Sequence, residues 1–153
     1  MVADYFSALG TYWDERALRD FLSALGISGV PTLDEDGWSG FLNNHKFGIE
    51  LTFYPESRVK VRLRDYPEGA GVLYNIRFYG TKTRLFEPFE GQLPLGLQFG
   101  ASKNSLIKDC GPPDSEVPDL GSMRWDRERY CLFAMLSDDG SLQALSLQLP
   151  VKE

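Results

Sequence analysis

Apolar residues recur at three- and four-residue intervals over residues 14–25, and Gly26 follows the last of them. This spacing is that of one buried helix face, and glycine commonly ends a helix. We therefore expect a helix from Asp14 to Leu25. The next segment, residues 27–40, is rich in glycine, proline and acidic side chains, which is typical of a loop.

Alternating apolar and polar residues predict strands after this loop. Residues 47–53, 59–63 and 72–79 each carry an apolar side chain at every second position. A period of two is typical of strands with one buried face. The first two segments are close enough in sequence to form a hairpin, which would place Glu50 opposite Arg62 and pair their charges.

The second half of the chain has the same order of predicted elements. Ser102 is a suitable N-cap for a short helix that ends at Gly111, and an acidic loop follows. Strands are predicted at 123–125, 130–137 and 142–149, with an Asp-Asp-Gly turn in the last hairpin. The order of helix, loop and antiparallel strands therefore occurs twice.

These elements predict a single domain over residues 1–153 with an α+β fold. It would contain a mostly antiparallel β-sheet built from two helix-loop-strand repeats, residues 12–80 and 96–149, whose sequence identity is slight. The helices would pack on one face of the sheet. The other face would be open to solvent or to a partner.

Length and composition are those of one ordinary globular domain, with 153 residues of which 42% are hydrophobic. A chain of this length buries roughly 70% of its unfolded surface, so it can build a core without metals or disulfides. Sixteen basic and 22 acidic side chains give a formal net charge of −6. This balance argues against a nucleic-acid binder, whose affinity would come from neutralising phosphates.

No catalytic or metal-binding motif emerges from the sequence, so we expect neither an enzyme nor a bound cofactor or metal. One histidine and two cysteines are too few for a usual zinc site. His45 lies just before a predicted strand, and we expect an exposed turn residue, with a general base as the alternative. Cys110 and Cys131 lie among apolar residues and are expected to be small buried thiols.

Nothing in the sequence predicts export or membrane insertion. The first residues lack the basic stretch and apolar core of a signal peptide, and no apolar run approaches the ~20 residues of a membrane-spanning helix. We therefore expect a cytoplasmic protein with reduced cysteines and no membrane partner.

Charge is distributed in three blocks along the chain. Residues 1–44 hold seven acidic and two basic side chains, which gives a charge of −5. Residues 45–84 hold four acidic and eight basic side chains, for a charge of +4. Residues 85–153 hold eleven acidic and six basic side chains, for a charge of −5. A solvent-facing strand accounts for the central block, and a docking face for an acidic partner is the alternative. The basic residues of this second candidate face are Arg58, Lys60, Arg62 and Arg64.

Acidic side chains cluster in the two loops that follow the predicted helices. If the repeats pack side by side, these loops would form one negative rim that attracts a basic partner; solvated loops are the alternative. Tryptophan residues beside the loops would anchor the contact, unless they belong to the core. The predicted partner-binding residues are Asp34, Glu35, Asp36, Trp38, Asp114, Glu116, Asp119 and Trp125.

One segment of the second half resembles small repeat proteins. It comprises Leu97-Gln98-Phe99-Gly100-Ala101-Ser102, followed by Leu106, Ile107, Gly111, Pro113 and Asp114. The segment is similar to a run in SmpA-type outer-membrane assembly lipoproteins and in the β-lactamase-inhibitor-like fold, where it forms the helix that precedes an antiparallel sheet. The chain differs from the lipoproteins because it has no lipid-acceptor cysteine near Met1.

A longer set of segments resembles small bacterial immunity proteins, the partners of secreted polymorphic toxins. The segments are residues 43–51, 76–80, 91–99 and 125–126. The resemblance implies an inhibitor that neutralises a toxin by binding it and has no activity of its own. Such families share no single binding site, so no site residues follow from the resemblance.

The first hypothesis is a cytoplasmic immunity protein that occludes the active site of a cognate toxin. A nuclease toxin would suit an acidic rim that imitates phosphate. The alternative is a secretion chaperone or adaptor, because many of these are small acidic α+β proteins, and it requires a homodimer. Monomer and homodimer therefore both stay open, as does an enzyme of unfamiliar type.

Overall fold

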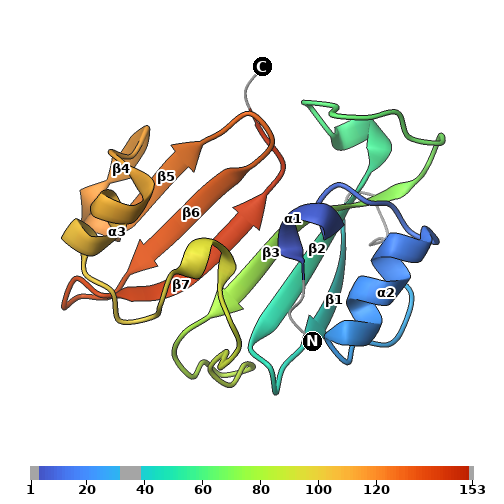
Figure 1. Ribbon diagram of the computed structural model, residues 1–153. Helices are drawn as coiled ribbons and strands as arrows, with labels where there is room; N and C mark the ends of the chain where they lie inside the picture. The colour runs from blue at the N-terminus through green and yellow to red at the C-terminus, as the bar shows by residue number, and fades with distance from the viewer. Residues whose placement is uncertain (1–3, 32–38, 152–153) are drawn as a thin grey trace.

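Residues 4–31 and 39–151 are described by a computed structural model, in which one seven-stranded antiparallel sheet is joined by short helices (Figure 1). The α-helices are α1 (Tyr5–Ala8), α2 (Arg16–Ala24) and α3 (Lys103–Cys110). The strands are β1 (Gly40–Asn44), β2 (Ile49–Pro55), β3 (Gly71–Tyr79), β4 (Ser115–Val117), β5 (Ser122–Asp126), β6 (Cys131–Leu136) and β7 (Leu142–Gln148). Short 3-10 turns are η1 (Glu56–Arg58), η2 (Pro94–Gly96) and η3 (Pro118–Leu120). The fold is mostly β with some helix, which agrees broadly with the predicted class.

Two meanders make up the sheet. The strand order is β1-β2-β3-β7-β6-β5-β4, and the meanders meet where β3 pairs with β7. The paired strands are antiparallel throughout. β7 therefore lies in the middle of the sheet although it follows the other strands in sequence.

The two predicted helices are confirmed. The helix expected over residues 14–25 is α2, and Leu18 and Phe21 are buried on its inner face. The Ser102 hydroxyl oxygen accepts the backbone N–H of Ser105 at 3.1 Å, as expected for the N-cap of α3. α1 has four residues, which are too few to show a helical period in the sequence.

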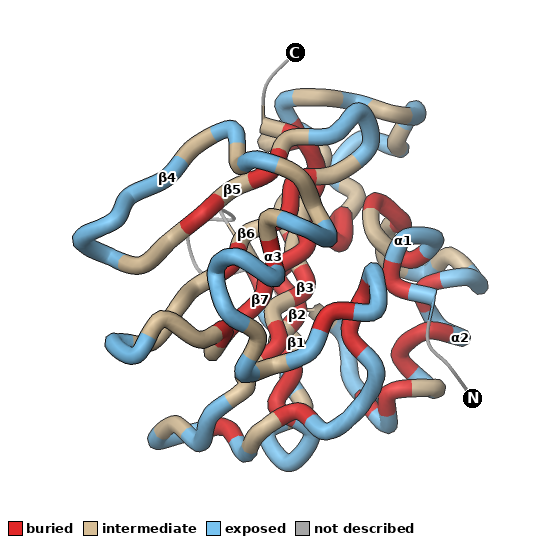
Figure 2. The backbone as a smooth tube through the Cα atoms, turned by 60° about the vertical axis from the view of Figure 1, so that its left-hand side comes forward, coloured by how far each residue is buried: buried red, intermediate tan, exposed pale blue. Residues whose placement is uncertain are grey.

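One face of the sheet packs with all three helices to form the main core. Leu51 of β2, together with Ile76 and Phe78 of β3, belongs to the same buried cluster as Leu18 and Leu106 from the helices. Figure 1 shows the helices on one side of the sheet, and Figure 2 shows buried segments along the strands in red. Burial of these apolar side chains is the main favourable contribution to folding.

The predicted second strand of the first hairpin is wrong. After β2 the chain turns through η1, where the Val59 N–H donates to the Glu56 carbonyl at 3.1 Å, and continues as a loop. Arg62 forms an ion pair with Glu56 across this turn. β2 pairs with β3 instead, so Glu50 lies opposite Arg77.

The apolar residues of this loop explain the misleading alternation. Val59 and partly buried Leu63 pack against Val72, Tyr74 and Leu149, in a second and smaller apolar cluster. The alternating pattern therefore identified residues that contact the sheet, although they do so from a loop. Strand pairing is decided by non-local contacts, which a local pattern does not contain.

β1 and β4 lie in segments that were predicted as loops or turns. They form opposite edges of the sheet, six strand spacings of ~4.8 Å apart. Glu116 of the second predicted acidic segment lies on β4. Four residues predicted for the acidic rim lie outside the described residues, namely Asp34, Glu35, Asp36 and Trp38.

Candidate functional site

The sheet face opposite the helices carries one row of polar and aromatic side chains across the strands. The pairing registers place one residue of each strand in this row. In strand order the row consists of Asn43, Glu50, Arg77, Ser146, Phe133, Arg124 and Ser115. We call this face the open face, because no helix among the described residues covers it (Figure 1).

Arg77 of β3 lies in the first meander's part of the row, next to Ser146 of β7. Its Nη1 donates to the Ser146 hydroxyl at 3.3 Å, and its guanidinium carbon lies 5.2 Å from the Tyr79 ring centroid. The Tyr79 hydroxyl donates to Glu50 Oε1 at 3.3 Å. Burial raises the pKa of Tyr79, and the Glu50 carboxylate raises it further, so this hydroxyl remains a donor at neutral pH.

Arg124 of β5 lies in the second meander's part of the row, next to Phe133 of β6. Its Nε lies 3.0 Å from Asp126 Oδ1, and its guanidinium carbon lies 5.9 Å from the Phe133 ring centroid. The same carboxylate oxygen accepts the Cys131 thiol at 3.2 Å. Arg124 is therefore held by a carboxylate and an aromatic ring, and Arg77 by the Ser146 hydroxyl and an aromatic ring.

Two loops cover the ends of the open face. At one end, Val59 from the segment after η1 packs against Val72 and Tyr74. At the other end, the Phe86 ring stacks on Tyr79 with a centroid distance of 4.3 Å. Between these loops, the large side chains of the row keep partial exposure.

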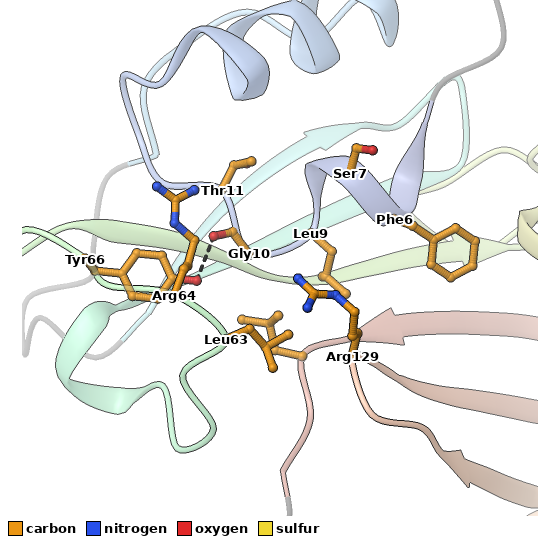
Figure 3. Close-up of a pocket in the computed structure, with 10 residues that line it drawn as sticks. Phe6, Ser7, Leu9, Gly10, Thr11, Leu63, Arg64, Tyr66 and Arg129 are labelled. Atoms are coloured by element: carbon orange, nitrogen blue, oxygen red, sulfur yellow. Dashed lines mark hydrogen bonds between the residues drawn. The ribbon is translucent and has the colours of Figure 1, made fainter.

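A pocket of about 400 Å³ lies at the end of the sheet where β7 finishes (Figure 3). Four segments enclose it: α1 with the residues after it, the loop before β3, the turn between β5 and β6, and the residue after β7. Its lining residues are Phe6, Ser7, Leu9, Gly10, Thr11, Leu63, Arg64, Tyr66, Arg129 and Leu149. We call it the arginine pocket, because two of these residues are arginine and none is acidic.

Gly10 and Tyr66 form one wall of the arginine pocket. The Tyr66 hydroxyl donates to the Gly10 carbonyl at 2.7 Å, as the dashed line in Figure 3 shows. Gly10 has a φ of +86°, and a Cβ there would lie 3.2 Å from Leu149 Cδ2, so the position favours glycine. Burial raises the pKa of Tyr66, which keeps its hydroxyl protonated and able to donate.

Arg64 is fixed at the rim by contacts on two sides. Its Nη1 lies 2.8 Å from Glu15 Oε1, and the same oxygen accepts the Tyr12 N–H at 2.9 Å. Its guanidinium carbon lies 5.2 Å from the Tyr12 ring centroid and 5.4 Å from that of Tyr66. The carboxylate and the two rings therefore hold this guanidinium in one position.

Arg129 reaches the pocket from the turn between β5 and β6. This turn is closed by the Arg127 N–H, which donates to the Tyr130 carbonyl at 2.9 Å. The Arg129 side chain is exposed and makes no hydrogen bond or ion pair with the described part of the chain. Figure 3 shows its guanidinium beside Leu9. All five of its N–H donors therefore remain for water or a ligand.

The hydroxyl groups of the pocket are engaged in local hydrogen bonds. The Ser7 hydroxyl donates to Asp4 Oδ2 at 2.6 Å, and the buried Thr11 hydroxyl donates to the Ala8 carbonyl at 2.6 Å. The chemistry that the pocket offers is therefore anion binding by arginine next to an apolar surface.

His45 and the cysteines lie outside this pocket. His45 is exposed in the turn before β2, as predicted, with its ring 4.7 Å from that of Phe86. Cys131 is buried and Cys110 is partly buried against the main core, and both are free thiols. Within residues 4–31 and 39–151, no group of three or more histidine, cysteine or acidic side chains could hold a metal ion.

The prediction that Trp125 is an exposed anchor is wrong. Its side chain is 1% exposed and belongs to the main core. Its indole Nε1 donates to the Gly111 carbonyl at 2.8 Å, which ties β5 to the end of α3. The alternative for the tryptophan residues beside the acidic loops was a place in the core, and Trp125 has that place.

The three acidic residues predicted in the second loop are on the surface but have separate partners. Asp114 Oδ2 lies 3.6 Å from Arg127, and it also accepts a backbone N–H of β5. Glu116 forms an ion pair with Lys103 of α3. Asp119 is exposed in η3. These residues therefore do not converge on one site.

Of the four basic residues predicted as a second face, only Arg64 lines the arginine pocket. Arg58 lies over the Tyr54 ring at 3.9 Å from its centroid. Arg62 is engaged by the ion pair across η1, and Lys60 is exposed. The four do not share a strand face because their segment is a loop.

The remaining pocket residues were missed by sequence reasoning. Arg129, Tyr66 and Gly10 come from three segments that are far apart in the chain. The row on the open face depends in the same way on the pairing of distant strands. No local signal in the sequence identifies either site.

Among the described residues, none of the helices combines the length and apolar character required to cross a membrane.

No family model matches the chain, and no curated protein matches it in sequence. In structure, the chain is similar to the crystal structure of a DUF4309 family protein (YjgB) from Bacillus subtilis subsp. subtilis str. 168, with 20% sequence identity and a TM-score of 0.41. The similarity covers 86% of this chain and 76% of that chain.

Proposed function

We propose that this protein is a cytoplasmic immunity protein that binds a cognate bacterial toxin and occludes its active site. The observation that carries the proposal is the open face, a broad sheet surface with charged and aromatic side chains in one row. Tyrosine, phenylalanine and arginine are enriched in the contact regions of protein interfaces.

The open face has the extent that a protein partner needs. Seven strands spaced ~4.8 Å apart give a surface ~30 Å across. A standard protein interface covers roughly 800 Å² on each partner. A surface of this width can lie over a substrate cleft and exclude the substrate by steric contact.

The charged side chains of the open face can bind a partner with little loss of conformational entropy. Arg77 and Arg124 are already held by neighbours on the same face, so few rotamers are lost when a partner covers them. The positive charges of the two arginines nearly balance the negative charges of Glu50 and Asp126. This surface suits a partner that presents both positive and negative side chains.

We also infer that the two meanders are structural repeats. The first repeat consists of α2 followed by β1–β3, and the second of α3 followed by β4–β7. Packing of both helices on one face leaves the opposite face of both repeats available for the partner. The repeats are thus the reason that the open face extends across the whole sheet.

Co-expression with the product of the neighbouring gene tests this proposal. We expect a complex that co-purifies, and protection of cells from the toxicity of that product. Combining Arg77→Glu with Phe133→Ala should abolish both effects, whereas Arg19→Glu on the exposed side of α2 should leave both unchanged. A chain that binds no such product, and whose deletion leaves cells unaffected, contradicts the proposal.

A secretion chaperone that acts as a homodimer is the second candidate, and one observation favours it. β1 is an edge strand on which Phe41 is 51% exposed, and Phe47 in the following turn is 50% exposed. Exposed edges with apolar side chains favour edge-to-edge pairing. Analytical ultracentrifugation separates the two candidates: a dimer that Phe41→Lys dissociates supports the chaperone, and a monomer supports the immunity protein.

A further inference from the structure

We propose that the arginine pocket binds a carboxylate next to an apolar side chain, presented by an acidic segment of the partner protein. The proposal rests on the proposed protein-binding function and adds a second contact region to it. It follows from three properties of the pocket: its charge, its apolar surface and its size.

The charge of the pocket is opposite to that of the protein. The chain has a formal net charge of −6, yet the pocket is lined by two arginines and by no acidic residue. Glu15 neutralises Arg64, while Arg129 has no partner within the described residues. The pocket therefore has one uncompensated positive charge, which attracts an anion and repels a cation.

The two arginines have different roles in this proposal. Arg64 is fixed by Glu15 and by the rings of Tyr12 and Tyr66, so it forms a permanent part of the rim. Arg129 is free to turn its planar guanidinium toward a ligand. A guanidinium with free N–H groups binds a carboxylate through two parallel hydrogen bonds.

Apolar side chains line part of the pocket beside the arginines. Leu9, Leu63 and Leu149 are among the lining residues, with Leu9 beside the Arg129 guanidinium (Figure 3), and Phe6 on the rim is 40% exposed. The Phe6 ring contacts Tyr130 at a centroid distance of 5.1 Å, which extends the apolar rim toward the β5–β6 turn. A ligand with only a charge would leave this apolar surface exposed to water.

The size of the pocket selects a side chain and not a large cofactor. Its volume of about 400 Å³ lies near the lower end of the range of ligand sites, roughly 300–1,000 Å³. An aromatic or aliphatic side chain with a neighbouring carboxylate fits this volume. The exposed rim around Phe6 provides contact area for the peptide backbone on either side, which a small free acid does not use.

Titration of the isolated full chain with short peptides tests this proposal by NMR. The probe is acetyl-Gly-Phe-Asp-Gly-amide, the matched control replaces its Asp by Asn, and 3-phenylpropionate represents a free acid. We expect the Asp peptide to shift the amide signals of Gly10, Tyr66 and Arg129, and to bind roughly tenfold or more tightly than the Asn peptide.

Arg129→Gln should weaken binding of the Asp peptide roughly tenfold or more, and Arg84→Gln, in an exposed loop, should leave it unchanged. Equal binding of the Asp and Asn peptides, or no effect of Arg129→Gln in a folded variant, overturns the proposal. Binding of 3-phenylpropionate as tightly as the peptide overturns the assignment to a protein segment.

This experiment is independent of the open face. If Arg77→Glu with Phe133→Ala abolishes protection from the toxin while Arg129→Gln does not, the proposed function stands and the pocket proposal fails. If the Asp peptide binds through Arg129 but no protein partner is found, the pocket binds carboxylates and the proposed function fails.

Discussion

The two faces of the sheet are built from alternate residues of the same strands but serve different purposes. In β6, Leu132 is 1% exposed in the main core, while its neighbour Phe133 is partly exposed on the open face. In β3, Ile76 is buried in the main core, while its neighbour Arg77 is partly exposed on the open face. One residue of each pair contributes to stability, and the other is available for contact with a partner. Stability and binding should therefore be separable by substitutions at adjacent positions.

Leu132→Ala should produce the largest loss of stability in this comparison. Removal of a fully buried leucine side chain costs about 2–5 kcal/mol of the free energy of unfolding. Phe133→Ala on the open face should cost about 1 kcal/mol, because it removes cross-strand contacts without opening a core cavity. Urea denaturation followed by circular dichroism measures both values.

The same pair of variants can contradict the comparison of the faces. If both substitutions cost the same free energy, the open face is packed as tightly as the helix-covered face. The open face would then not be available to a partner in the isolated chain.

Val59→Ala should have an intermediate effect. Val59 is buried, but it belongs to the small cluster that covers one end of the open face. We expect a loss of about 1–2 kcal/mol, between the values for the main core and for the open face. Lys60→Ala at the neighbouring exposed position serves as the control, with a change within about 0.5 kcal/mol. A loss for Val59→Ala as small as that of the control would show that this loop is not packed on the sheet.

The alkylation rates of the two cysteines measure how accessible their surroundings are, without any substitution. Cys131 on the open face is 1% exposed, whereas Cys110 at the end of α3 is partly exposed. Burial raises the pKa of both thiols, so iodoacetamide should react slowly with each at pH 8 and faster as the pH rises. Mass spectrometry should detect alkylation of Cys110 before that of Cys131. The opposite order would mean that the open face around Cys131 opens readily.

Asp139 lies in the turn between β6 and β7 and belongs to neither face of the sheet. We expect its pKa to affect stability less than the substitutions above. The hydroxyls of Ser137 and Ser141 and the Ser141 N–H donate to its carboxylate and lower its pKa from 3.8 to about 2. Because the folded pKa is lower, this stabilisation is present above about pH 4 and is lost as the pH falls through 2. NMR titration should give a pKa of about 2, which Ser137→Ala raises toward 3.8. An unchanged pKa in Ser137→Ala would exclude this hydroxyl as the cause.

Alternation and helix period in the sequence predicted most of the sheet and both longer helices. The predicted strands at 72–79, 130–137 and 142–149 correspond closely to β3, β6 and β7, because each carries apolar residues on its core face. The Ser102 cap and its helix were predicted for the same reason, since their interactions are local.

The failures concern contacts between distant residues. Val59 and Leu63 show the alternation of a strand, but an η1 turn and a short-range ion pair keep their segment a loop. Trp125 lies beside an acidic loop in the sequence, although its strand carries it into the core. Arg129 gave no signal at all, because its role depends on segments from both ends of the chain.

The central position of β7 has a consequence for synthesis of the protein. β1, β2 and β3 can pair once residue 79 has emerged from the ribosome, but the free edge of β3 waits for a strand that begins at Leu142. At translation rates of about 5–20 residues per second, this edge stays unpaired for several seconds. During that interval the nascent chain presents an apolar half-sheet, which favours chaperone binding or aggregation on the ribosome before β7 emerges.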